Sequence, residues 1–331
     1  MSVFEKIGNT PVIEYHGEVP NGNHIYFKLE CENPFGSHYD RVYPALYKHH
    51  EEKGTLNPGA TVLETTSGSA GVSFAGIGRE LGYKCIVAIP AGTENAREDA
   101  IKQQGAELRN TPADTYVSGF PKFLKCYLVK NRGVVFLNHS MGEFGVENRV
   151  TTQSLEAIAT EIQQQLGSID YYVAAVGNGS TVLGPGRVFA ALGTKVVTFE
   201  SFQSGVAYEM LYPGAYEREF GIMPGSLPRH NLFGTSYPGI KFPHIQIALQ
   251  KEHLVSESYL VSDAAVDDNY YKATGKEAPA ELPRWDAYQL RPYGRTTRAG
   301  LAVALKIAQR VRGKKIVALA YDKEDRYDSQ T

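Results

Sequence analysis

The stretch ATVLETTSGSAGVSFAGIGRELGYKCIVAIP, residues 60–90, decides the fold class. It begins with a short apolar run over 60–65, which is typical of a buried strand. Residues 69–81 then carry apolar side chains at helical spacing, and a second apolar run over 84–90 ends at a proline. A strand, a helix and a second strand in this order predict two parallel strands with a helix packed on one face.

The same alternation returns along the rest of the chain. We expect helices over 94–105, 151–167, 181–193 and 297–313, and strands beginning at 105 and over 170–177, 195–201 and 314–321. This order predicts an α/β fold with open, twisted, mainly parallel sheets and helices on both faces. We expect a loop over 133–145, and long loops with short elements over the Tyr-, Pro- and Gly-rich segment 201–293.

The composition favours a protein that binds small molecules. The chain has 331 residues and a formal net charge of −2, so it lacks the basic field that attracts nucleic acid or an anionic membrane. No apolar run approaches the roughly 18–20 residues that span a bilayer. The first residues lack a basic-then-apolar signal pattern, so we expect a cytoplasmic protein. Cys31, Cys85 and Cys126 lie singly, which favours reduced, buried packing residues, and we find no metal-binding signature.

Two strand-to-helix junctions have the composition of ligand-binding loops. The junction AVGNGSTVLG, residues 175–184, places Gly177, Asn178, Gly179, Ser180 and Thr181 at the start of a helix. Free N–H groups, the helix dipole and two hydroxyls suit a phosphate monoester. A tight turn that only needs two glycines is an alternative. A dinucleotide site is another, supported by Glu200 after the next strand but weakened by Val182 at the third glycine position.

The junction ETTSGSAG, residues 64–71, groups Thr66, Ser67, Gly68 and Ser69 at another helix start. Hydroxyls together with free N–H groups can bind a carboxylate. An elaborate helix cap is an equally good interpretation, because Ser and Thr are favoured there in any case. A hydrolase nucleophile elbow is excluded, because the chain contains no G-x-S-x-G.

Taken together, these segments resemble the cysteine synthase and cystathionine β-synthase branch of the fold type II (tryptophan synthase β-like) pyridoxal-phosphate enzymes. The resemblance covers nearly the whole chain, and no single motif decides it. Six motifs carry it in order: IGNTPVIEY (7–15), FKLECENPFGSHYDR (27–41), ETTSGSAG, GYKCIVAIP followed by QQGAEL, GNGST (177–181) and GRTTRAGLAVALKIA (294–308).

The resemblance implies a fold, a cofactor and a set of binding residues. Two α/β lobes would hold pyridoxal phosphate between them, with a smaller mobile lobe over 40–148 and a larger lobe over 1–39 plus 149–331. The 177–181 loop would bind the phosphate, Thr296 or Thr297 would meet the pyridine nitrogen, and the loop from Thr66 to Ser69 would bind the carboxylate of a small amino acid. Known relatives are commonly homodimers, which we expect here too.

The chain departs from the family pattern where the cofactor is bonded. Tyr39 occupies the position of the Schiff-base lysine, which holds the cofactor and moves the Cα proton in the family. A phenol cannot form the imine, and its pKa of about 10 would have to fall before it served as a base. His38 is the adjacent titratable group, unless it is an ordinary helix-start histidine turned away. Ser69 replaces an asparagine at the cofactor's 3′-oxygen, and Arg298 replaces a glycine.

Two functions from different classes are compatible with this pattern. One is an enzyme that acts by β-elimination, β-replacement or a related reaction on a small amino acid, with pyridoxal phosphate held non-covalently or brought in as an amino-acid adduct. Tyr39 and His38 would then be its catalytic groups. The other is an inactive family member that binds an amino acid or a phosphorylated metabolite as a sensor or partner subunit. A lyase or transferase whose substrate supplies the phosphate is a weaker third reading. An engineered Lys-to-Tyr exchange is disfavoured, because Ser69 and Arg298 differ as well.

Overall fold

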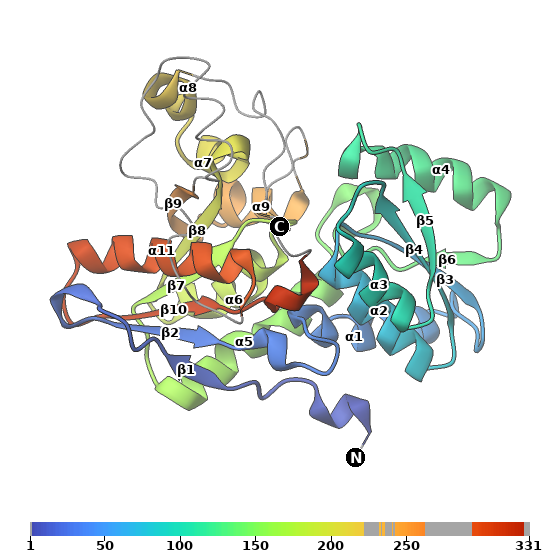
Figure 1. Ribbon diagram of the computed structural model, residues 1–331, viewed down its shortest axis with the longest axis horizontal. Coiled ribbons are helices and arrows are strands. Elements are labelled where there is room, and N and C mark those ends of the chain that lie inside the picture. The colour runs from blue at the N-terminus through green and yellow to red at the C-terminus, as the bar shows by residue number, and fades with distance from the viewer. Residues whose placement is uncertain are drawn as a thin grey trace.

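The computed structural model describes residues 2–221, 232, 234–235, 240, 242–261 and 293–327. They form two lobes, each built on its own sheet, which lie beside each other in Figure 1. The larger sheet has six strands in the order β1-β2-β10-β7-β8-β9, and the smaller has four in the order β5-β4-β3-β6. The expected α/β class, with two open and mainly parallel sheets, is confirmed.

In the larger sheet only the β1–β2 pair is antiparallel. The central strand β7 is buried along its whole length, as a strand covered by helices on both faces should be. The strands are β1 (Val12–Glu14), β2 (His24–Lys28), β7 (Tyr171–Ala175), β8 (Lys195–Ser201), β9 (Val255–Val261) and β10 (Lys315–Leu319).

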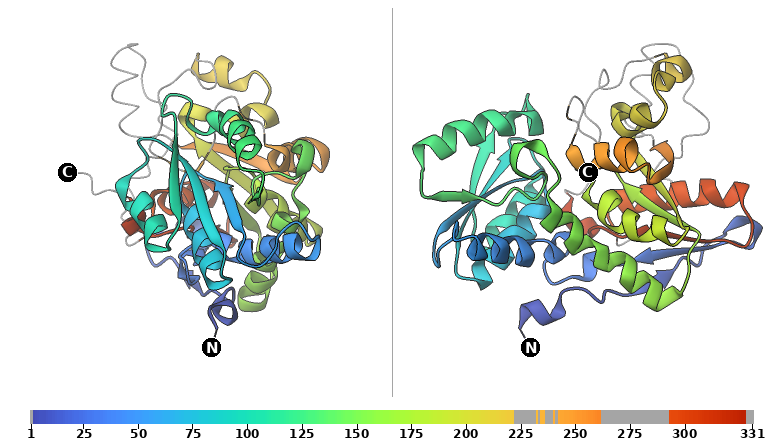
Figure 2. Two further views of the ribbon diagram at one scale, coloured as in Figure 1. Left: turned by 90° about the vertical axis from the view of Figure 1, so that its right-hand side faces the viewer. Right: turned by 180° about the vertical axis from the view of Figure 1, so that it is seen from behind.

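Helices cover both faces of this sheet. Helix α11 (Arg295–Arg310) lies on the face seen in Figure 1, whereas α5 (Arg149–Leu166) and α6 (Ser180–Ala191) lie on the opposite face, seen in Figure 2. Shorter helical elements follow β8 and precede β9: α7 (Val206–Leu211), α8 (Ala215–Phe220), α9 (Pro243–Gln246) and a π-helical turn (Ile247–Lys251).

The smaller lobe is a parallel sheet between two helical layers. Its strands are β3 (Thr61–Thr65), β4 (Lys84–Pro90), β5 (Glu107–Thr111) and β6 (Val134–Phe136). Its helices are α1 (Tyr43–Glu52), α2 (Ser69–Glu80), α3 (Asn95–Gln103) and α4 (Phe120–Lys130). Helix α4 packs against a small core of Leu63, Ile86 and Ala88 on the sheet face opposite α2. Every strand of this sheet falls inside the expected range 40–148, whose end points stay predictions.

The alternation of strands and helices is confirmed, and the described part of 201–293 holds short elements as expected, but one loop prediction is wrong in part. The segment 133–145 contains β6, whose three residues are too few to give a period in the sequence. The segment 201–293 contains β9, a seven-residue strand at the edge of the larger sheet, where apolar and polar residues mix. Much of the rest of that segment lies outside the described residues. Cys31 and Cys85 are buried as expected, whereas Cys126 on α4 is exposed.

Candidate active site

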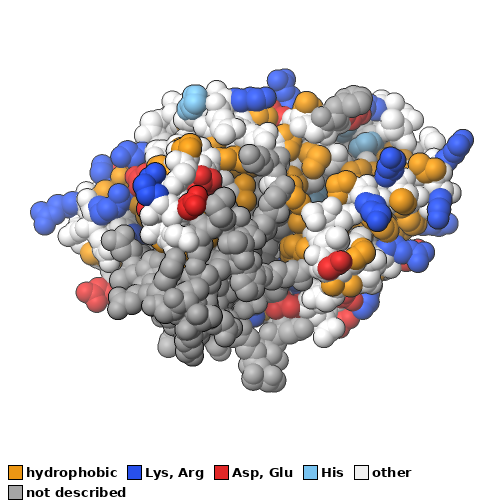
Figure 3. Space-filling view, turned by 90° about the horizontal axis from the view of Figure 1, so that it is seen from above, with side chains coloured by type: hydrophobic (Ala, Val, Ile, Leu, Met, Phe, Trp, Pro, Cys, Tyr) orange, Lys and Arg blue, Asp and Glu red, His pale blue; other side chains and the backbone are white. Residues whose placement is uncertain are grey.

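A cavity of about 510 Å³ lies where the carboxyl ends of strands from both sheets meet. Figure 3 shows apolar side chains gathered along the seam between the lobes on the face seen from above. The cavity wall is formed by the β3–α2 loop, the residues after β6, the β7–α6 loop, the start of α11 and the end of β10. Ligands of open α/β sheets bind in such a position, so both predicted loops contribute to one site.

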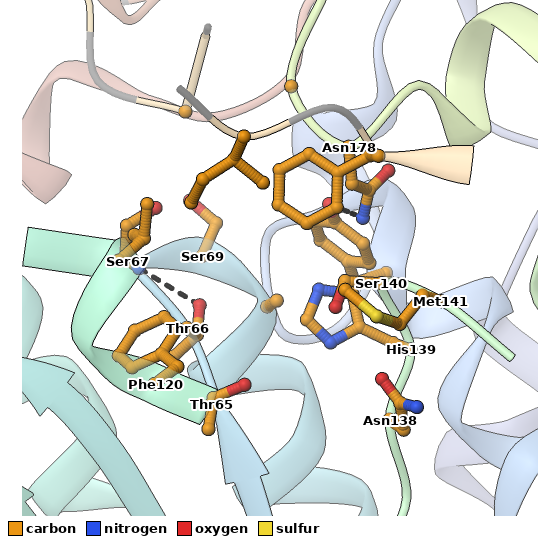
Figure 4. Close-up of a pocket in the computed structure, with 18 of the residues that line it drawn as sticks. Thr65, Thr66, Ser67, Ser69, Phe120, Asn138, His139, Ser140, Met141 and Asn178 are labelled. Carbon is orange, nitrogen blue, oxygen red and sulfur yellow. Dashed lines mark hydrogen bonds between the residues drawn. The ribbon is translucent and has the colours of Figure 1, made fainter. Parts of the chain in front are cut away.

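All four predicted residues of the first loop line the cavity: Thr66, Ser67, Gly68 and Ser69. Figure 4 labels Thr66, Ser67 and Ser69. The Thr66 hydroxyl accepts a hydrogen bond from the N–H of Gly68 at 3.0 Å, which fixes the turn. The Ser69 hydroxyl donates to Asp322 Oδ2 at 3.1 Å. Helix α2 begins at Ser69, so its first N–H groups lie beside the cavity and can bind an anion.

Arg97 of α3 closes this loop from the side. Its Nη1 donates to the carbonyl of Ser67 at 3.2 Å, and its Nη2 lies 3.9 Å from Asp322 Oδ2. A side chain at Gly68 would overlap the guanidinium, so the glycine is required for this close approach. Arg97 is buried, and it is the only cationic side chain among the described residues that line the cavity.

The second predicted loop contributes Gly177, Asn178 and Thr181 to the cavity, whereas Gly179 and Ser180 lie behind them. Gly179 has a φ of +89°, and an added Cβ would overlap the backbone N–H of Ile245. This glycine therefore serves the turn and the packing behind it. The Asn178 side chain accepts a hydrogen bond from the N–H of Ser180 at 2.9 Å and caps the start of α6.

The two threonines of the 294–308 motif are likewise divided between the cavity lining and the packing behind it. Thr296 lines the cavity, while Thr297 is fully buried and lies outside the lining. Within the described residues the Thr297 hydroxyl has no hydrogen-bond partner. Arg298 neither enters the cavity nor points to solvent, because it is buried and its Nη2 lies 2.6 Å from Glu324 Oε2.

Tyr39 and His38 both line the cavity, from a single 3₁₀ turn (His38–Arg41). Their ring centroids are 4.0 Å apart, and Asn178 Nδ2 donates to the Tyr39 hydroxyl at 3.4 Å. Burial raises the pKa of Tyr39 above its ordinary value, so the phenol stays neutral and donates hydrogen bonds. Burial also lowers the pKa of His38 to about 3, so its imidazole is neutral near pH 7. The reading of His38 as turned away from the pocket does not hold.

A buried ion network fixes this turn against the larger lobe. Arg41 binds Glu30 through Nε and Nη2 at 2.7 and 2.8 Å, and Glu161 through Nη1 and Nη2 at 2.6 and 2.8 Å. Lys28 Nζ reaches Glu161 at 2.6 Å. Although burial by itself would raise the pKa of Glu161, hydrogen bonds from Arg41 and Lys28 lower it to about 2. On the other side of the turn, Asp40 accepts hydrogen bonds from Ser73 and Phe35.

Sequence reasoning missed two residues beside Tyr39. His139 follows β6 and points into the cavity in Figure 4, with its ring centroid 5.0 Å from that of Tyr39. Its Nδ1 lies 3.1 Å from Oε2 of Glu64 on β3 and 3.1 Å from the Tyr43 hydroxyl. Glu64 is fully buried. A charged residue inside an apolar strand run was the available signal for Glu64, whereas His139 had none.

The cavity wall opposite the β3–α2 and β7–α6 loops is apolar. Sequence reasoning did not predict these residues either. This wall comes from α4, the turn before it, the end of β6 and the segment before α9. Its residues are Val117, Phe120, Pro121, Leu124, Phe136, Met141, Ile240 and Phe242. The cavity is therefore polar toward the starts of α2 and α6 and apolar toward α4.

The residues present fit pyridoxal phosphate at one end and not at the other. The start of α6 offers backbone N–H groups, a helix dipole and the Thr181 hydroxyl, which suit a phosphate. No lysine occurs among the described residues that line the cavity, so they cannot supply the usual covalent attachment. The described part of the chain contains no cluster of three metal-ligating side chains and no helix able to cross a membrane.

Comparison with known proteins places the chain beside cysteine synthases. Residues 3–322 match the model of a family described as "Pyridoxal-phosphate dependent enzyme". The cysteine synthase of Staphylococcus aureus strain N315 is 33% identical over 189 residues, which covers 56% of this chain and 59% of that protein. The probable cysteine synthase of Bacillus subtilis is 26% identical, over 97% of this chain and 94% of that protein. The O-acetylserine-dependent cystathionine β-synthase of Helicobacter pylori shares the fold, with a TM-score of 0.78 at 22% identity, covering 100% of this chain and 97% of that one.

Proposed function

The chain belongs to the pyridoxal-phosphate dependent enzymes, and from this premise we propose that it is a cysteine synthase-like enzyme that works without the cofactor lysine. It holds the cofactor non-covalently, or takes it up as an adduct with an amino acid. Its reaction is a β-elimination, a β-replacement or a related step on a small amino acid. One observation carries the proposal: the starts of α2 and α6 line one cavity together with Tyr39, and no lysine occurs among the described residues of its lining.

In this proposal the binding residues are those that line the cavity at the two helix starts. The start of α6, with Asn178 and Thr181, holds the phosphate, and the loop from Thr66 to Ser69 holds the carboxylate of the amino acid. Thr296 lies at the ring of the cofactor, which supplies an electron sink for carbanion chemistry when bound. Thr297, Gly179 and Ser180 act only by shaping these surfaces, because they lie outside the lining.

Tyr39 is proposed as a proton donor. Its raised pKa keeps the phenol protonated near neutrality, which suits donation to a leaving group and opposes a role as base. His38 is neutral under the same conditions, and its Nδ1 has no hydrogen-bond partner within the described residues. It can therefore accept a hydrogen bond from a ligand at this end of the cavity.

A second candidate function is a binding protein without turnover, a sensor or a partner subunit. The absence of a lysine from the described cavity lining favours it. A homodimer and a mobile smaller lobe over 40–148 belong to either proposal as expectations from the family. Light scattering of the purified protein measures the first, and solution scattering with and without ligand measures the second.

An absorbance spectrum of the purified protein, recorded before and after addition of pyridoxal phosphate, tests the proposed function. We expect absorbance of the free aldehyde that survives desalting and is lost on denaturation. Pyridoxal without its phosphate is the matched control and should be retained much more weakly. A ligand at one hundred times its dissociation constant should also stabilise the fold by about 2.7 kcal/mol.

Addition of small amino acids then separates the two functions. Spectral change with release of product supports the enzyme, whereas amino-acid binding without turnover supports the sensor. A protein that takes up neither pyridoxal phosphate nor its amino-acid adducts would contradict both.

A further inference from the structure

We propose that His139, oriented by Glu64, is the group that takes the proton from the Cα of the bound amino acid. This rests on the proposed function and names a residue for the proton transfer that the family assigns to its lysine. Among the described residues, three other titratable groups line this end of the cavity: Tyr39, Tyr321 and His38. Burial raises the pKa of Tyr321, as it does that of Tyr39. A neutral phenol is a weak base, and the low pKa of His38 makes its imidazole a weak base as well.

Two groups contact Nδ1 of His139: Glu64 Oε2 and the Tyr43 hydroxyl, each at 3.1 Å. Burial and the neighbouring Glu64 raise the pKa of Tyr43, so this hydroxyl stays protonated; we infer that it donates to Glu64 and accepts from Nδ1–H. Glu64 Oε2 also accepts the backbone N–H of His139 at 3.1 Å. The other carboxylate oxygen accepts the N–H of Thr65 at 2.8 Å, so both oxygens of this fully buried group are used. An ionised carboxylate only accepts hydrogen bonds. We therefore assign the proton of the neutral ring to Nδ1, which leaves Nε2 as an acceptor.

The location of His139 suits this role. It follows β6, at the carboxyl edge of the smaller sheet, and lines the cavity beside Tyr39. A carboxylate beside Nδ1 fixes the orientation of the imidazole and selects its tautomer. The arrangement is that of an oriented general base whose orienting group lies on an adjacent parallel strand.

The proposed step is a simple proton transfer. The Cα–H bond of the amino acid breaks, the proton moves to Nε2 of His139, and the electron pair stays on the substrate carbon. A cofactor held at the start of α6 and joined to the amino group of the substrate would supply the electron sink for that pair. The proton returns from the same nitrogen. Glu64 is a positioning residue, because it acts through His139.

The first test needs neither cofactor nor turnover. Nitrogen-15 NMR of the ligand-free protein, with His139→Gln used to assign the signal, reports the tautomer of this ring. We expect the Nδ1–H form in the wild type and a changed tautomer balance in Glu64→Gln. An Nε2–H form in the wild type would overturn the proposal, because that nitrogen could not accept a proton.

The second test measures exchange of the Cα hydrogen with deuterium in D₂O. Wild type, His139→Gln and the matched control His16→Gln, whose histidine is exposed, are saturated with pyridoxal phosphate and serine. We expect His139→Gln to retain binding of both compounds, followed by absorbance, and to lose at least about a hundredfold in exchange rate. Glu64→Gln should lose less, and His16→Gln should match the wild type.

The outcomes separate this proposal from the proposed function. Exchange in the wild type that survives in His139→Gln would overturn the role of His139 and leave the enzyme intact. Weaker serine binding with an unchanged rate at saturation would make His139 a binding residue and would also overturn it. A wild type that binds pyridoxal phosphate but exchanges no hydrogen would refute the enzyme, and the proton transfer with it.

Discussion

The two ends of the cavity differ in what they keep of the family pattern. At the start of α6, the glycines and hydroxyls of the 177–181 motif remain in the arrangement that suits a phosphate. At the turn His38–Arg41, Tyr39 stands at the position that we propose corresponds to the family's lysine, with His38 and His139 beside it. In our proposal this difference means that cofactor binding and covalent attachment are separable. The helix starts would take up the cofactor, and Tyr39, His38 and His139 would serve the other end of the cavity.

The anchoring of the Tyr39 turn gives the largest expected effect. Arg41→Met would leave Glu30 and Glu161 buried without their main partner, so we expect a loss of about 3–5 kcal/mol in the free energy of unfolding. Denaturant titration measures it. Lys48→Met is the matched control, because Lys48 pairs with Glu52 at the surface and should change stability by about 1 kcal/mol or less. Equal losses in the two variants would show that the turn is not held in this way.

The next largest effect is the pH dependence of the stability that Glu161 contributes through this ion network. The pKa of Glu161 is about 2 in the folded protein and ordinarily 4.5. The stability that this group contributes is therefore present above about pH 4.5 and is lost as the pH falls toward 2; at neutral pH it is roughly 3 kcal/mol. The stability difference between wild type and Glu161→Gln, measured from pH 7 to pH 3, should shrink below pH 4.5. A constant difference would argue against the ion pair.

Two glycine-to-alanine variants test whether the turn before α6 needs a glycine at residue 179. Gly179→Ala places a Cβ at a φ of +89° and against the N–H of Ile245, whereas Gly193→Ala meets a φ of +78° and no neighbour within 4 Å. We expect a loss of about 1 kcal/mol at Gly193 from backbone strain alone, and about 2–3 kcal/mol at Gly179. Thermal unfolding compares them. Equal losses would mean that the α6 turn relaxes away from Ile245.

Loss of the hydrogen bond between Asn178 and Tyr39, which joins the two ends of the cavity, has the smallest expected effect on stability. Tyr39→Phe removes the hydroxyl that accepts from Asn178 at 3.4 Å, so stability should change by about 1 kcal/mol or less. Cofactor uptake should persist while the rate of elimination falls, because the proton donor is gone. Loss of uptake in this variant would assign Tyr39 to cofactor binding instead.

The sequence predicted the fold and the loops because both depend on local pattern. Alternating apolar runs located β3, α2 and β4, and glycine with hydroxyl residues marked the starts of α2 and α6. The contacts that hold the site are long-range. Glu64 and His139 are 75 residues apart, and Arg41 and Glu161 are 120 apart.

Besides its long-range contact with Glu64, a second feature kept His139 from being predicted as a site residue. It follows β6, a strand of three residues that gives no period in the sequence, so its place at the carboxyl edge of a sheet could not be inferred. The raised pKa of Tyr39 is likewise a result of burial, which depends on how the two lobes pack. Local sequence predicts that Tyr39 replaces the lysine, and the packing shows which groups surround Tyr39.

Borohydride reduction followed by peptide mapping tests most directly whether the cofactor is held without a covalent bond. Wild type and Tyr39→Lys are loaded with pyridoxal phosphate, reduced, digested and analysed by mass spectrometry, after absorbance has shown uptake in both. We predict that the peptide containing residue 39 gains the cofactor's mass in Tyr39→Lys only, while the wild type releases its cofactor on denaturation. A wild-type protein that retains cofactor on a lysine peptide from the cavity would contradict the account.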